Sequence, residues 1–114
     1  MSEISWERLS VLIVEDNSFV RFILTNTLDA IGIRNVATAP DGKAAIDLMN
    51  QVKDNPLKAG ISAVDIILSD FFMPEVDGNL FLRWVRSAKH LPDRFVPFIM
   101  VSGAADPEIV AVVR

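Results

Sequence analysis

Four oxygen-bearing side chains stand where short apolar segments of this chain end. Glu15 and Asp16 follow the first segment, Asp70 ends the third, and Ser102 follows the fourth. If these segments are parallel strands of one sheet, their carboxyl ends meet at one edge, where open parallel sheets bind ligands. Three carboxylates gathered there would raise one another's pKa unless a cation balanced their charge. An all-oxygen, water-retaining site suits Mg²⁺ better than Zn²⁺, so the residues predict a magnesium site.

Each of these residues also has a simpler interpretation. An acid at a strand end can cap the next helix or lie in solvent, and a single acid would favour that interpretation. Ser102 could be an ordinary hydroxyl bonded to the backbone. Three acids on two strands, each directly after an apolar strand, favour the metal site instead.

The elements that would position these residues alternate along the chain. The apolar runs predict strands at 11–14, 35–39, 64–69 and 95–101. Apolar residues at helical spacing predict helices at 20–31, 43–52 and 80–91, and a fourth helix opening at 106–108. Four strand–helix units in succession imply one α/β domain of parallel strands with helices on both faces.

Composition excludes several classes of protein. The 114 residues are 51% apolar and 23% charged, which fits one ordered domain. A net charge of −4 argues against a nucleic-acid-binding surface, since phosphate binding needs excess base. The absence of cysteine excludes disulfides and thiolate sites, and a single histidine excludes sites that need two imidazoles. Neither a signal peptide nor an apolar run of membrane-spanning length is present, so a cytoplasmic protein without a membrane role is expected.

Three strings of residues resemble the response-regulator receiver domain. They are V-L-I-V-E-D-N from Val11, D-G-K-A-A from Asp41 and I-L-S-D-F-F-M-P-E-V-D-G from Ile67. The resemblance covers residues 9–114 and leaves 1–8 as an N-terminal leader. It implies a flavodoxin-like, doubly wound parallel sheet, with four of the usual five βα units present.

The resemblance also assigns roles to the strand-end residues. Asp70 would be the phosphoacceptor, forming 4-aspartylphosphate, and Asp16 a direct Mg²⁺ ligand with Glu15 acting through a water. The Phe72 backbone carbonyl would complete the protein ligands, and the Ser102 hydroxyl would meet the phosphoryl group. The donor would be a sensor histidine kinase or a histidine phosphotransfer protein. Such a domain accepts a phosphoryl group and switches partner binding, and it does not turn over a metabolite.

The chain departs from the family pattern in two places. The family's fifth strand, with its phosphoryl-contacting lysine, has no counterpart before Arg114, which suggests a C-terminally incomplete domain. The apolar fourth strand would then be an unpaired sheet edge, and such an edge predicts a homodimer. The stretch 53–63 is also longer than usual and predicts an extended loop.

Two other functions stay open at this point. A receiver-like interaction or dimerisation module that is not phosphorylated is favoured by the missing lysine and opposed by the acid cluster. A Mg²⁺-dependent phosphohydrolase with an aspartyl nucleophile generally has another acid two residues on, where this chain has Phe72. The kinase, the pathway and the output cannot be identified from these residues.

Overall fold

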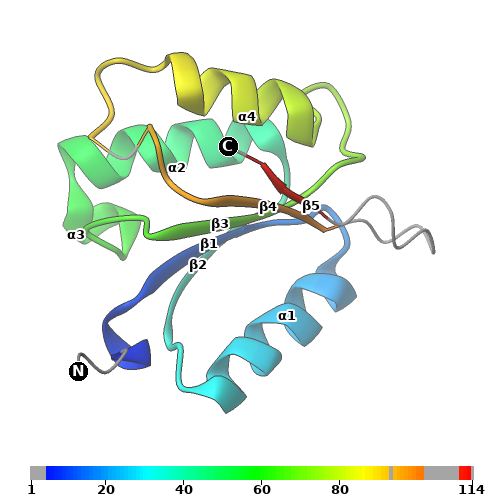
Figure 1. The fold of residues 1–114 in the computed structure, drawn as a ribbon, viewed down its shortest axis with the longest axis vertical. Helices are drawn as coiled ribbons and strands as arrows, with labels where there is room; N and C mark the ends of the chain where they lie inside the picture. Colours follow the sequence, from blue (N-terminus) through cyan, green and yellow to red (C-terminus); the bar gives the residue numbers. More distant parts are fainter. Residues whose placement is uncertain (1–4, 93, 102–110, 114) are drawn as a thin grey trace.

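The computed structural model describes residues 5–92, 94–101 and 111–113 (Figure 1). The elements follow one another as η1 (Trp6–Arg8), β1 (Ser10–Val14), α1 (Ser18–Ile31), β2 (Asn35–Ala39), α2 (Gly42–Asp54), α3 (Pro56–Ala59), β3 (Ile66–Asp70), α4 (Gly78–Ser87), β4 (Phe98–Val101) and β5 (Ala111–Val113). None of the helices in these described ranges has both the length and the apolar content that a membrane crossing requires.

The strands form one sheet in the order β2-β1-β3-β4-β5, and the first four are parallel. The predicted doubly wound α/β fold is therefore confirmed. The chain moves outward from β1 to β2 on one side, then crosses back to β3 and β4 on the other. Strand order reverses between β1 and β3, and this is where ligands of open α/β sheets bind.

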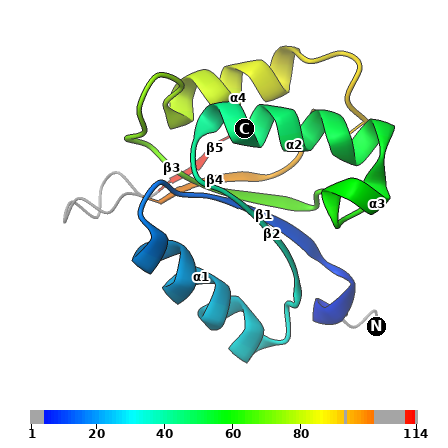
Figure 2. The ribbon, with the colours of Figure 1, turned by 180° about the vertical axis from the view of Figure 1, so that it is seen from behind.

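The two faces of the sheet are covered unequally. Among the described helices of four or more residues, α2, α3 and α4 lie on one face and α1 lies on the other (Figures 1 and 2). β1 is buried along its whole length because alternate side chains enter the two layers. Leu12 and Val14 join the large cluster under α2 and α4, whereas Val11 and Ile13 pack with Ile33 on the side of α1.

The C-terminal strand β5 corrects one prediction. The apolar residues after 109 were expected to continue a helix that opens at Asp106, but 111–113 pair antiparallel with β4, with Met100 opposite Ala111. The free edge of β4 offers hydrogen bonds, and valine-rich segments suit strands, so pairing replaces helix formation. The outer edge of β4 is thus occupied, and the predicted dimer through that edge loses its basis. Asp106 itself lies outside the described residues.

The stretch 53–63 is more ordered than the expected extended loop. α2 continues to Asp54, and the short helix α3 follows directly. The Asn55 side chain accepts a bond from Lys58 N–H, Pro56 occupies the first turn, and Gly60 ends the helix with a φ of 85°. These are ordinary helix start and stop signals, so the local sequence is sufficient to explain why this stretch contains a short helix in place of an extended loop.

Candidate functional site

The structure brings Glu15, Asp16 and Asp70 together at the carboxyl edge of the sheet. β1 and β3 are adjacent and in register, with Val14 opposite Ser69, so the residues that follow them are neighbours. One carboxylate oxygen from each acid lies within 4.8 Å of the others. Glu15 is only 4% exposed and Asp70 8%, whereas Asp16 is exposed. We refer to these three residues as the acid cluster.

Hydrogen bonds fix the backbone that carries the first two acids. Glu15 N–H donates to Ala39 O of β2 at 3.1 Å, and Arg21 Nη1 donates to Glu15 O at 2.7 Å. Glu15 Oε1 accepts a bond from Asn17 N–H at 3.1 Å. The Asn17 side chain in turn caps α1, accepting from Phe19 N–H and Val20 N–H. The end of β1 is therefore joined to both β2 and α1.

The turn after β3 brings the start of α4 against the third acid. Gly78 N–H donates to Phe71 O at 2.9 Å, and a Cβ added at Gly78 would lie 2.4 Å from Asp70 O. Phe72 N–H donates to Asp70 Oδ1 at 3.4 Å. The Phe72 ring is 59% exposed and meets Phe71 edge-on, so it stands at the rim of the cluster.

The two Asp-Gly pairs of the sequence have the same structural role. Asp41 accepts from Ala44 N–H at 2.7 Å and Asp77 accepts from Leu80 N–H at 2.8 Å, which caps α2 and α4. The glycines permit close approach, since a Cβ on Gly42 would lie 2.4 Å from the carbonyl oxygen of Val76. These aspartates therefore start helices and do not belong to the acid cluster.

Burial changes the acidity of two members of the cluster. It raises the pKa of the Glu15 carboxyl from 4.5 to about 7; the bond from Asn17 N–H opposes this rise and the charge of Asp70 adds to it. Burial also raises the pKa of Asp70, against the effect of the Phe72 and Phe71 N–H groups. The one ion pair found between described side chains, Arg34–Asp29, lies elsewhere. The cluster thus contains more negative charge than its surroundings stabilise.

The free energy of unfolding of the metal-free protein is expected to fall between pH 4.5 and 7. Folded Glu15 binds a proton more tightly than unfolded Glu15, so the unfolded state is favoured as that proton is lost. This difference in pKa between the folded and unfolded states lowers the free energy of unfolding by up to about 3 kcal/mol at pH 8. Urea denaturation at pH 5 and pH 8 without divalent cations measures it, and Glu15→Gln should show less of the decrease. Equal pH dependence in the two proteins would contradict this prediction.

The donor set of the cluster fits a hard divalent cation. All three side chains offer carboxylate oxygens, two of these acids are buried, and burial raises the pKa values of both, with a smaller contribution from the neighbouring carboxylates. The cluster could hold a metal ion. Ser102, the fourth residue predicted for the site, lies outside the described residues.

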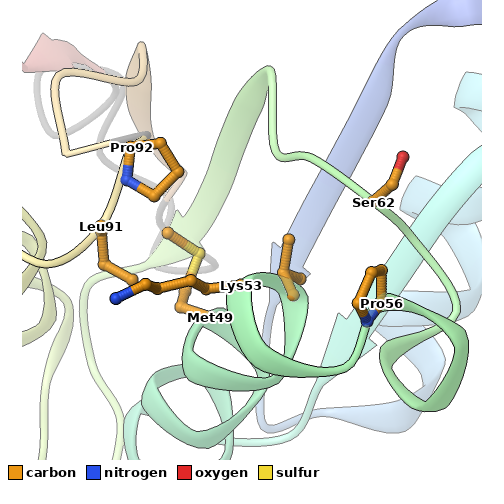
Figure 3. A pocket seen from close by; sticks show the side chains of 7 residues that line it. Met49, Lys53, Pro56, Ser62, Leu91 and Pro92 are labelled. Carbon is orange, nitrogen blue, oxygen red and sulfur yellow. The ribbon is translucent and has the colours of Figure 1, made fainter.

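A cavity of about 240 Å³ has no residue of the acid cluster in its lining. Figure 3 shows the side chains that line it. It is formed by the end of α2, α3 and the segment after α4. The lining residues are Met49, Val52, Lys53, Pro56, Ser62, Leu91 and Pro92. The cavity is smaller than typical ligand sites of about 300–1,000 Å³ and is mostly apolar, so we assign it no ligand.

Comparison with known proteins gives one consistent result. Residues 11–113 match the response regulator receiver domain. A chemotaxis protein CheY homolog of Campylobacter jejuni is 33% identical over 94 residues, which are 82% of this chain and 64% of that protein. This chain therefore spans less than two thirds of that relative.

Solved structures agree with the sequence comparison. A response regulator receiver protein from Pseudomonas putida superposes with a TM-score of 0.68 at 25% identity, covering 89% of this chain and 73% of that one. The receiver domain of the histidine kinase CKI1 from Arabidopsis thaliana, complexed with Mg²⁺ and BeF₃⁻, superposes with a TM-score of 0.66 at 30% identity. That match covers 90% of this chain and 72% of that one.

Proposed function

Since this chain belongs to the response regulator receiver domain family, we propose that it is a phosphoacceptor switch of a two-component phosphorelay. Asp70 is the acceptor in this proposal, and its phosphorylation alters the binding of a partner. The observation that carries the proposal is the acid cluster, whose carboxylate oxygens lie within 4.8 Å of one another at the point where strand order reverses.

The proposed reaction is a nucleophilic displacement at phosphorus. An Asp70 carboxylate oxygen attacks the phosphoryl group of a phosphohistidine, the P–N bond breaks, and its electron pair returns to the imidazole nitrogen. The product is an acyl phosphate on Asp70. Phe72 N–H holds the acceptor carboxylate through Oδ1, and Gly78 brings the start of α4 against the Asp70 backbone. These contacts fix the nucleophile before the donor arrives.

Mg²⁺ is the cation we propose for the acid cluster. Asp16 and Asp70 would hold it directly, Glu15 through a water, and the Phe72 carbonyl would supply a further oxygen. When bound, the ion neutralises charge on the transferring phosphoryl oxygens. The Ser102 hydroxyl is proposed to donate to a phosphoryl oxygen and so to couple phosphorylation to the loop that follows it.

The proposed donor is a sensor histidine kinase or a histidine phosphotransfer protein. A protein donor must bring its phosphohistidine to Asp70 and therefore contacts the rim of the site. Phe72 stands on that rim, and Phe19 and Phe22, 67% and 61% exposed, lie on the first turns of the helix that Asn17 caps. Exposed aromatic side chains of this kind are enriched at protein interfaces. A cytoplasmic location stays a prediction from the sequence.

Calorimetry with Mg²⁺ and beryllofluoride, a phosphoryl mimic, tests the proposal. We expect saturable binding at one site when both are present and none with beryllofluoride alone. An absence of heat with both would favour a receiver-like interaction module that is not phosphorylated. Sustained release of phosphate from small phosphoesters over many turnovers would indicate a hydrolase instead.

A further inference from the structure

We infer that Arg21 is a positioning residue for the acid cluster. It holds the peptide between Glu15 and Asp16 and thereby sets where the Asp16 carboxylate lies. The inference rests on the proposed function, because it concerns how the acids are arranged to hold a cation.

The contact that carries the inference joins α1 to the end of β1. Arg21 Nη1 donates to Glu15 O at 2.7 Å, a short bond strengthened by the charge of the guanidinium. Arg21 is half-buried, and its own N–H donates to Asn17 O at 3.0 Å in the first turn of α1. A capped helix therefore holds the backbone of the arginine while its side chain reaches back to the strand.

Asp16 depends on its neighbours for its position. Its side chain is exposed, so packing does not hold it in place. The peptide before it is held at Glu15 O by Arg21, and the peptide after it is held at Asn17 N–H by Glu15 Oε1 at 3.1 Å. Removing the Arg21 bond frees the first of these two peptides, and Asp16 can then rotate away from Asp70.

The sign of the effect on cation binding separates positioning from simple charge. If Arg21 acted on the cluster only through its positive charge, removing it would strengthen Mg²⁺ binding, because like charges repel. If Arg21 positions Asp16, removing it weakens Mg²⁺ binding. A role confined to stability would lower the melting temperature and leave the affinity of the folded protein unchanged.

Arg21→Met and Arg21→Lys test the inference. Methionine keeps an extended side chain without a donor, whereas lysine keeps both the charge and a donor. We expect Arg21→Met to weaken Mg²⁺ affinity about tenfold in calorimetry, and Arg21→Lys to stay within about threefold of wild type. Arg83→Met, at an exposed position of α4, is the matched control and should bind as wild type does. Unchanged or tighter binding by Arg21→Met would overturn the inference.

A second readout needs no metal. Amide hydrogen exchange at Asn17 in the metal-free protein should accelerate in Arg21→Met and not in Arg83→Met. If wild type itself fails to bind Mg²⁺, the proposed function fails, and this exchange rate still tests whether Arg21 holds the turn. If Arg21→Met does not fold, Arg21→Lys decides: a folded lysine variant in which exchange at Asn17 accelerates while Mg²⁺ affinity stays at the wild-type value would contradict the inference.

Discussion

Asp70→Asn is expected to accept no phosphoryl group from either a protein donor or a small-molecule donor. An amide oxygen carries no negative charge and is a poor nucleophile, so the rate should fall by more than about a thousandfold. Incubation with Mg²⁺ and acetyl phosphate, followed by mass spectrometry of the intact protein, measures the label. Wild type should gain the mass of one phosphoryl group, and the variant should gain none.

The same variant should remain folded, which separates loss of chemistry from loss of structure. Asp70 is buried with a raised pKa, so replacing its charge with a neutral amide removes the cost of burying a negative charge in the folded protein at pH 8. Its urea midpoint should equal or exceed that of wild type. Asp77→Asn is the matched control, because asparagine also caps helices and the phosphoryl label should persist. Labelling of Asp70→Asn at Glu15 or Asp16 would contradict the assignment of the acceptor.

The sequence was sufficient to predict the sheet and the gathering of the acids. Val11 to Val14 and the run before Asp70 are apolar without alternation, which is typical of strands covered on both faces. Parallel strands in register place the residues that follow them at one edge of the sheet. The sequence alone therefore predicts that Glu15, Asp16 and Asp70 lie close together. Their chemical roles remain predictions.

Other features depend on contacts that no local pattern contains. The residues of β5 are compatible with either a helix or a strand, and the free edge of β4 decides between them. The bond from Arg21 to Glu15 O joins two elements through a long side chain, and nothing in the spacing of these residues indicates it. The start of α3 is different, because Asn55 before Pro56 is a local helix-start signal within the stretch expected to be a loop.

Gly78→Ala is expected to lower the free energy of unfolding by about 3 kcal/mol or more. The added Cβ would lie 2.4 Å from Asp70 O, 2.9 Å from Met100 Sδ and 3.0 Å from Phe71 Cα. A methionine side chain can move, but two of these three atoms are backbone at the end of β3, so the turn itself must shift. Urea denaturation measures the loss of stability.

Gly60→Ala distinguishes this crowding from the general effect of adding a methyl group. A Cβ at Gly60 meets nothing within 4 Å, although its φ of 85° makes alanine strained by about 1–2 kcal/mol. Gly78→Ala should therefore lose more stability than Gly60→Ala, even though Gly78 has an ordinary backbone conformation. It should also weaken Mg²⁺ binding, because the shifted atoms carry Asp70, whereas Gly60→Ala should not. Equal stability losses with unchanged Mg²⁺ affinity would show that the start of α4 does not hold the acceptor in place.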